Sequence, residues 1–283
     1  MTKIAIVTDS TSYIPKEYLE KYNITLVPQI LLWDGETLED GVDIQPDAFY
    51  RRLATAKVMP TTSQVPIPSM LRAFSSLIAQ DYHVLGIFVS SKLSGTFQSA
   101  LQAHDMLETG KEKVAVVDSH TTAMAMGFLA LNAARAGMDG ASLLDCKALV
   151  ENGRAKTGVY FMVDTLEFLH RGGRIGGAQR LLGTALNLKP ILAVVDGKVE
   201  SIERIRTKSK AMDRLVEIVV EQCAGKSVQL ATLHANASED AKAVLESASK
   251  LMSVTDKIFT EVSPVVGAHT GPGTIGLAYM TDK

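Results

Sequence analysis

Residues 83–96 read HVLGIFVSSKLSGT, a continuous apolar run followed by hydroxyl-bearing residues and a glycine. The run from His83 to Ser90 predicts a buried β-strand, and Ser94-Gly95-Thr96 predicts the start of a helix that continues through Leu107. A strand that leads directly into a helix is the repeating unit of α/β proteins, in which helices cover both faces of a parallel sheet. This stretch therefore predicts an α/β fold.

The same alternation of strand and helix patterns runs through the whole first half of the chain. Apolar runs predict strands at Lys3–Thr8, Ile24–Leu32, His83–Ser90 and Lys113–Asp118. Periodicity and flanking residues predict a short helix opened by Pro15, then helices at Pro46–Ala56, Ser69–Ala79, Thr121–Arg135 and Ala141–Arg154. Lys57–Pro68, with three prolines, is predicted to be a loop rich in hydroxyl groups.

The second half has a different rhythm, which predicts a mixed or antiparallel sheet. Asp196-Gly197 is a two-residue hairpin signal between the strand patterns Leu188–Val195 and Lys198–Arg206. The other patterns predict strands at Gly158–Val163, Val228–Leu233, Lys257–Val262 and Thr274–Met280, and helices at Lys208–Cys223 and Ala237–Met252.

Two domains follow from this change of rhythm, with the boundary near Asn152–Thr157. We expect an N-terminal three-layer α/β/α domain with a mainly parallel sheet over residues 1–155. A C-terminal α+β domain with a mixed or antiparallel sheet is expected over residues 156–283.

The composition excludes several classes of protein. The 283 residues are 46% hydrophobic and carry 29 Lys+Arg against 31 Asp+Glu, so the chain is neither disordered nor basic enough to favour nucleic acid. The two cysteines, Cys146 and Cys223, are expected to be core thiols. The weakly apolar stretch Ala123–Ala134 is shorter than the roughly 20 residues of a membrane span, and Lys3–Thr8 is too short for a signal-peptide core. We therefore expect a cytoplasmic protein without stable membrane insertion.

Two hydroxyl clusters are candidate ligand positions. Ser94-Gly95-Thr96 follows a strand at the carboxyl edge of the predicted sheet, where a helix start offers free N–H groups to an anion. The alternative is that Ser94 or Thr96 simply caps the helix. Thr61-Thr62-Ser63-Gln64 is the second cluster, and its alternative is a turn or cap before the next helix.

Other motifs favour a binding protein over an enzyme. The basic, glycine-rich segment 169–177 contains Arg174 and can bind an anion, or it can be a flexible connector. Residues 271–276 match a dinucleotide fingerprint, but too few residues follow for the helix and strand that it requires. His269 lies beside these glycines and is either a site residue or structural. No pair of histidines has metal-ligand spacing, and no Gly-x-Ser-x-Gly turn occurs, so neither a metal nor a cofactor is indicated.

The sequence resembles the DegV family of bacterial fatty-acid-binding proteins over nearly its whole length. The resemblance rests on the order and spacing of these segments: Val7-Thr8-Asp9-Ser10, Thr61-Thr62-Ser63-Gln64, 90–96, Val117-Asp118-Ser119, Gly172-Gly173-Arg174-Ile175 and 267–273. The chain departs from the family at Val65-Pro66-Ile67-Pro68, where Pro usually follows the Ser-Gln pair directly. This departure affects the expected start of the next helix and leaves the hydroxyl groups unchanged.

The resemblance implies a long-chain fatty acid, such as palmitate, in a buried tunnel between the two domains. It implies that the carboxylate is bound by Ser94 with Gly95 and Thr96, by Thr62 (or by Thr61 after a slip of one residue), and by His269. It also implies a non-catalytic protein that presents the fatty acid to a separate kinase, which forms an acyl phosphate.

Arg174 and Arg206 occupy the positions that the resemblance assigns to that step, facing the partner and its phosphate groups.

Two other readings stay open from the residues alone. One is an enzyme for phosphotransfer or acyl hydrolysis that uses the hydroxyl cluster. The other is a regulatory module that senses a small anion.

Overall fold

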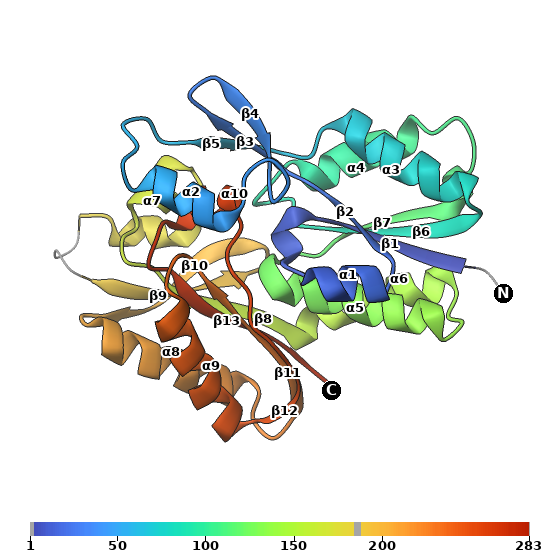
Figure 1. The fold of residues 1–283 in the computed structure, drawn as a ribbon. Helices are drawn as coiled ribbons and strands as arrows, with labels where there is room; N and C mark the ends of the chain where they lie inside the picture. Colours follow the sequence, from blue (N-terminus) through green and yellow to red (C-terminus); the bar gives the residue numbers. More distant parts are fainter. Residues whose placement is uncertain (1–2, 184–187, 283) are drawn as a thin grey trace.

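The computed structural model describes residues 3–183 and 188–282, which form three β-sheets with helices packed around them (Figure 1). Met1, Thr2 and Lys283, at the outer ends of the two predicted domains, lie outside the described residues. The N-terminal sheet is parallel and the C-terminal sheet is mixed, so the predicted α/β fold class is confirmed.

The parallel sheet has the strand order β2-β1-β6-β7. Its strands are β1 (Lys3–Asp9), β2 (Ile24–Val27), β6 (Tyr82–Phe88) and β7 (Val114–Asp118). β1 and β6 are buried along almost their whole length, because helices cover both faces of the sheet. The carboxyl ends of β1 and β6 lie side by side, since Thr8 pairs with Ile87. The polar residues after these two strands therefore meet at one edge of the sheet.

Helices on both faces of this sheet make three layers (Figure 1). One face is covered by α3 (Ile67–Ala79) and α4 (Thr96–Asp105). The other face is covered by α5 (Ala123–Met138) and α6 (Leu143–Gly153), with α1 (Lys16–Lys21) beside β2. α3 begins at Ile67, two residues before the predicted Ser69, because Pro66 has the extended backbone of an N-cap residue and Ile67 and Pro68 start the helix.

The mixed sheet has the strand order β10-β9-β8-β13-β11-β12, and only β11 and β12 pair in parallel. Its strands are β8 (Thr157–Met162), β9 (Lys189–Val195), β10 (Lys198–Ile205), β11 (Ser227–His234), β12 (Ser253–Ile258) and β13 (Ile275–Thr281). One face packs against α8 (Lys208–Gln222) and α9 (Ser238–Leu251). The predicted hairpin at Asp196-Gly197 is present between β9 and β10.

A third sheet was not expected from the sequence. β3 (Ile30–Trp33) pairs with both β4 (Glu36–Glu39) and β5 (Thr61–Ser63) in antiparallel directions. The predicted strand Ile24–Leu32 is therefore wrong as one element, because Pro28 and Gln29 separate β2 from β3 and the two strands belong to different sheets. The predicted loop Lys57–Pro68 is wrong where β5 pairs with β3. α2 (Pro46–Leu53) packs its Phe49 ring edge-on against Trp33 of β3 at 5.5 Å.

Three further segments differ from their predictions. The segment 169–177 includes the end of a short helix, α7 (Glu167–Arg171), and the start of a 3₁₀-helix, η4 (Gly176–Leu181). The strand predicted at Lys257–Val262 lies at Ser253–Ile258 instead. It is an edge strand whose residues are alternately exposed and at least partly buried, so it does not have the apolar run on which the prediction was based. α10 (Pro264–Thr270) was not predicted. The remaining 3₁₀-helices are η1 (Ser10–Ser12), η2 (Lys111–Lys113) and η3 (Arg154–Lys156).

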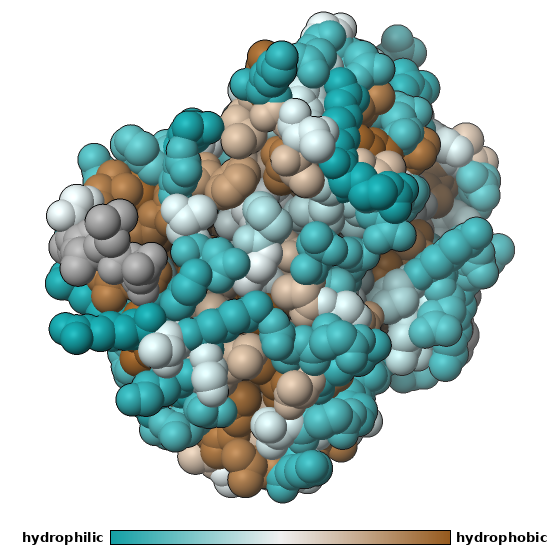
Figure 2. All heavy atoms as spheres, turned by 60° about the vertical axis from the view of Figure 1, so that its left-hand side comes forward, coloured by the Kyte–Doolittle hydropathy of each residue, from teal (hydrophilic) through white to brown (hydrophobic). Residues whose placement is uncertain are grey.

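α5 joins the two large sheets. It packs against β1 and β6 of the parallel sheet and against β8, β11 and β13 of the mixed sheet. A single hydrophobic cluster accordingly runs through both halves, from Ile6 and Leu85 through Phe128 to Phe161 and Ala278. On the face that Figure 2 shows, the surface is mainly hydrophilic and apolar side chains form small separate areas.

Within residues 3–183 and 188–282, no helix combines the length and hydropathy that crossing a membrane requires.

The hairpin turn of the mixed sheet docks on the edge of the parallel sheet. The Ser90 hydroxyl donates to the Gly197 carbonyl at 2.9 Å, and Lys92 Nζ donates to the Asp196 carbonyl at 2.7 Å. Gly197 has a φ of +77°, and a Cβ added there would collide with the Ser90 Oγ atom. Only glycine therefore fits this turn against Ser90.

We predict that Gly197→Ala lowers the free energy of unfolding by about 1 kcal/mol more than Gly35→Ala does. Gly35 is the matched control, because it occupies the Asp-Gly turn between β3 and β4 with a φ of +82° and has no atom within 4 Å of its Cβ position. Urea unfolding of the two variants measures the difference. Equal losses would show that the clash between the added Cβ atom and Ser90 Oγ has no effect on the free energy of unfolding.

Candidate functional site

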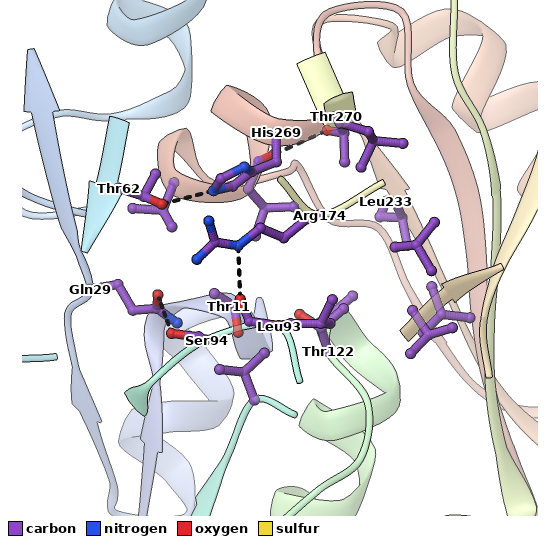
Figure 3. A pocket seen from close by; sticks show the side chains of 18 of the residues that line it. Thr11, Gln29, Thr62, Leu93, Ser94, Thr122, Arg174, Leu233, His269 and Thr270 are labelled. Carbon is purple, nitrogen blue, oxygen red and sulfur yellow. Dashed lines mark hydrogen bonds between the residues drawn. The ribbon is translucent and has the colours of Figure 1, made fainter. Parts of the chain in front are cut away.

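A cavity of about 180 Å³ lies between the carboxyl edge of the parallel sheet and the mixed sheet. It is lined by residues from both sides of residue 155, the predicted end of the first domain. Figure 3 shows Thr62, Gln29, Ser94 and Arg174 around a common space at one end, and Thr11, Thr122 and Thr270 also line the cavity. Leu233 lies on the opposite side of this view. The cavity therefore has a polar end and an apolar extension.

The inner face of the mixed sheet supplies a large part of the apolar wall. Val159 and Phe161 are two residues apart on β8 and share this face, while Tyr160 and Met162 point to α8 and α9. The apolar lining residues are Val89, Leu93, Ala123, Val159, Phe161, Leu169, Val194, Val199, Leu233, Val265 and Val266. Such a wall has no partner for a charged group and suits a hydrocarbon chain.

Thr62 and His269 meet at the polar end. Thr62 lies on β5 and His269 on α10, and Thr62 Oγ1 is 2.7 Å from His269 Nε2. Burial, and then the positive charge of Arg174, lower the pKa of His269 to about 4. The ring is therefore neutral at pH 7. His269 lies in the last turn of α10, which ends at Thr270 and is followed by Gly271.

Ser94 belongs to a compact group of hydroxyls at the start of α4. Its Oγ atom is 3.0 Å from Thr96 Oγ1 and accepts a hydrogen bond from the Thr96 N–H at 3.3 Å. The N-cap residue of α4 is Gly95, which lines the cavity and packs against Gln64. Thr96 is fully buried behind Ser94, where its Oγ1 accepts from the Val65 N–H at 3.2 Å. Ser94 thus faces the cavity and Thr96 supports it.

The predicted residues are therefore brought together only in part. Thr62, Ser94, Gly95, His269 and Arg174 line one cavity. Thr61 is exposed on β5 and is not among the lining residues, and neither is Thr96. Arg206 is exposed after β10, outside the cavity wall, and has no ion pair or side-chain hydrogen bond within the described part of the chain.

Arg174 is held in the cavity wall by backbone oxygens. Its Nε donates to the Leu93 carbonyl at 3.0 Å, and its Nη1 donates to the Gly172 carbonyl at 2.7 Å. The first of these bonds is also visible in Figure 3. No ion pair of Arg174 with a carboxylate occurs among residues 3–183 and 188–282. Its positive charge is therefore available to an anion in the cavity.

Gln29 is a lining residue that the sequence patterns did not indicate. It is 3% exposed and accepts a hydrogen bond from the Ser94 hydroxyl on its Oε1 at 3.3 Å. Its Nε2 donates to Asp9 Oδ1 at 3.2 Å. Burial raises the pKa of Asp9, although hydrogen bonds from Thr11, Val89 and Gln29 oppose the increase. Gln29 was hidden because it lies inside the apolar run 24–32, which reads as one strand.

Within the described residues, no group of three or more His, Cys, Asp or Glu side chains has the arrangement of a metal site.

Comparisons with known proteins agree with this architecture. A family model described as "Uncharacterised protein, DegV family" matches residues 3–282. A DegV family protein from Thermus thermophilus, described as binding fatty acid, is 34% identical with a TM-score of 0.92, and the match covers 99% of this chain and 100% of that one.

Two other solved structures are similar over nearly their whole length. DegV from Bacillus subtilis, described as a fatty acid binding protein, is 34% identical with a TM-score of 0.89 and full coverage of both chains. A stearic acid-binding protein from Eubacterium ventriosum is 25% identical with a TM-score of 0.90, covering 99% of this chain and 98% of that one. Because the family model and the first two relatives align with nearly the whole length of this chain, the chain belongs to the DegV family.

Proposed function

We propose that this protein binds one long-chain fatty acid, such as palmitate, in the cavity between its two halves. The carboxylate lies at the polar end with Thr62, Ser94 and Arg174, and the tail follows the apolar wall. The observation that carries the proposal is that two hydroxyls and a guanidinium surround one end of a cavity whose wall also has a large apolar part. The fatty acids named for the similar structures support it.

Burial of the tail supplies enough free energy for tight binding. A chain of ~15 methylenes at about 0.8 kcal/mol each offers roughly 12 kcal/mol before the costs of association. The head group then needs correct placement more than strong attraction. Hydroxyl donors and one guanidinium can provide this through charge-assisted hydrogen bonds. A sensor for a small anion would have no use for the apolar wall.

The protonation and tautomer of His269 leave the Thr62 hydroxyl proton free for the ligand. The buried Nδ1 atom of His269 has no hydrogen-bond partner in the described structure, so a proton there would be an unsatisfied buried donor. We infer that the neutral ring carries its proton on Nε2 and donates it to Thr62 Oγ1 across 2.7 Å. The Thr62 hydroxyl then donates to the carboxylate. His269 thus sets the direction of the Thr62 hydroxyl.

We further propose that the bound carboxylate is presented to a separate fatty acid kinase, with no catalytic group supplied by this chain. The DegV resemblance supports this step. Arg174 in the cavity wall and Arg206 on the exposed segment after β10 are the cations that face the partner and its phosphate groups. Arg174 then has two roles: it faces the phosphate groups of the partner, and its charge also lies beside the fatty acid carboxylate.

Gently purified protein is expected to show, in native mass spectrometry, the mass of one long-chain fatty acid above that of the chain. Ser94→Ala should lower the occupancy, because the carboxylate loses a hydroxyl donor. Ser91→Ala is the matched control, since Ser91 is exposed on the same turn and does not line the cavity. Unchanged occupancy in Ser94→Ala would remove Ser94 from the site.

Arg174→Ala is expected to weaken fatty acid binding by about tenfold, because a charge beside the carboxylate is lost. Arg206→Ala should leave the affinity unchanged and slow acyl phosphate formation when a kinase is added. Displacement of a fluorescent fatty acid measures the first effect, and release of ADP measures the second. Equal affinities for the two variants would contradict the placement of the carboxylate beside Arg174.

The His269 ring is expected to titrate with a midpoint near pH 4 in the folded protein. Because this pKa lies below that of an unfolded histidine, about 6.5, the folded state loses stability as the pH falls from 6.5 towards 4. His269→Gln should lose less stability over this interval. Ring C–H resonances in NMR give the midpoint, and urea unfolding at several pH values gives the stability. A midpoint near 6.5 would contradict a buried, neutral His269.

A further inference from the structure

Gln29 presents a hydrogen-bond acceptor to the cavity, and its orientation is fixed. Gln29 Nε2 donates to Asp9 Oδ1 at 3.2 Å, and turning the amide over would set its oxygen against the Asp9 carboxylate. Asp9 is itself held by the Val89 N–H at 2.9 Å and by the backbone and hydroxyl of Thr11 at 2.9 and 2.6 Å. Gln29 Oε1 therefore points towards Ser94 and accepts from its hydroxyl (Figure 3).

The hydrogen bonds around Ser94 have only one consistent direction. Gln29 Oε1 can only accept, so the Ser94 hydroxyl is the donor of that bond. In the 3.0 Å contact between Ser94 and Thr96, Thr96 must then be the donor, and Thr96 Oγ1 in turn accepts from the Val65 N–H. Ser94 has a single proton, and Gln29 takes it in the structure.

A fatty acid carboxylate competes with Gln29 for this proton, because a carboxylate is also only an acceptor. When Ser94 donates to the carboxylate, Gln29 Oε1 loses its only donor among the described residues. Gln29 is 3% exposed, so bulk water does not replace the bond. Arg174 is anchored to the carbonyls of Leu93 and Gly172 and makes no hydrogen bond with Gln29 within the described structure. An unsatisfied buried acceptor weakens the complex.

Resting on the proposed function, we propose that the preferred ligand is a fatty acid with a hydrogen-bond donor next to its carboxylate, and that Gln29 determines this specificity. The shared chemistry is an O–H group directed at Gln29 Oε1. It has two possible sources, a hydroxyl on the second or third carbon of the acyl chain, or the proton of the un-ionised carboxyl group. Either source gives Gln29 Oε1 a new hydrogen-bond donor in place of the Ser94 hydroxyl, which now donates to the carboxylate.

Delipidated wild-type protein distinguishes these sources through displacement of a fluorescent fatty acid. The ligands are palmitate, 2-hydroxypalmitate and 3-hydroxypalmitate, with 2-methoxy- and 3-methoxypalmitate as controls that add an oxygen without a donor. A hydroxyl source predicts that a hydroxy acid binds about tenfold more tightly than palmitate and its methoxy analogue. A carboxyl-proton source predicts instead that palmitate binding weakens steadily from pH 6 to pH 9.

Arg174 and His269, the cation and the imidazole at the head group, do not produce that slope. Arg174 stays charged over this range, and His269, whose pKa burial lowers to about 4, stays neutral. Burial raises the pKa of Asp9, which lies behind Gln29, although its four hydrogen bonds favour the ionised form. Burial also raises the pKa of Asp40, which interacts with Asp9, to about 6. Hexadecanol, which has no carboxyl proton, is therefore the control: a slope that it shares with palmitate comes from these protein groups and rules out the carboxyl-proton source.

Gln29→Leu removes the acceptor and should abolish the preference for the hydroxy acid over palmitate, or the pH dependence of palmitate binding. Ser94→Ala is the matched control, because it should weaken all ligands and leave their ratio unchanged. If wild type binds palmitate and both hydroxy acids alike, with no slope from pH 6 to pH 9, the inference about Gln29 fails and the proposed function stands. If no fatty acid binds, both fail.

The comparison of ligands on wild-type protein does not depend on any variant. Thermal unfolding shows whether Gln29→Leu keeps the fold. A preference for hydroxy acids that persists in folded Gln29→Leu would also overturn the role of Gln29.

Discussion

The structure depends on a buried carboxylate, that of Asp9 at the end of β1. A buried charge is costly unless hydrogen bonds compensate it, and Asp9 is fully buried. Its donors come from η1, from the residue after β6 and from the junction of β2 and β3, through Thr11, Val89 and Gln29. Any arrangement that moved one of these segments away would remove at least one of the four hydrogen bonds to the buried charge. The requirement to satisfy Asp9 thus fixes the carboxyl edge of the parallel sheet, where we propose that the head group binds.

Neither half of the chain contains a complete site. The hydroxyls of Thr62 and Ser94 come from the first half, whereas Arg174, His269 and most of the apolar wall come from the second. α5 holds the halves together, because its buried residues contact both large sheets. Polar contacts add to this on another side, where Arg135 of α5 pairs with Asp256 of β12 at 3.1 Å. Packing on α5, together with the docking of the Asp196-Gly197 turn on Ser90 and Lys92, sets the relative position of the sheets and hence the shape of the cavity.

The sequence was informative where structure is local. The strand and hydroxyl turn of residues 83–96 are predictable because a continuous apolar run and the residues that follow it carry the signal within a few positions. The sheet formed by β3, β4 and β5 was not, because β5 consists of three hydroxyl-bearing residues that pair with a strand about thirty positions away. Pairing of that kind leaves no local pattern.

The site was predictable to a similar extent. Thr62, Ser94 and His269 stand out through the family resemblance, while Gln29 lies in an apolar run and looks like part of a strand. The wall residues Val159 and Phe161 have the same alternation as ordinary core residues, so sequence periodicity cannot distinguish a cavity wall from a packed interior. Only the three-dimensional arrangement separates the two.

The place of β13 in the mixed sheet has a consequence for synthesis of the chain. β13 follows all the other described strands in sequence, yet it lies between β8 and β11 and pairs with both. A ribosome adds roughly 5–20 residues per second, so β8 and β11 leave it several seconds before the strand that joins them. During that time each has an unpaired edge, which is a template for aggregation. Chaperones that bind exposed strand edges are therefore expected to act on the second half of this nascent chain, after the parallel sheet has already formed.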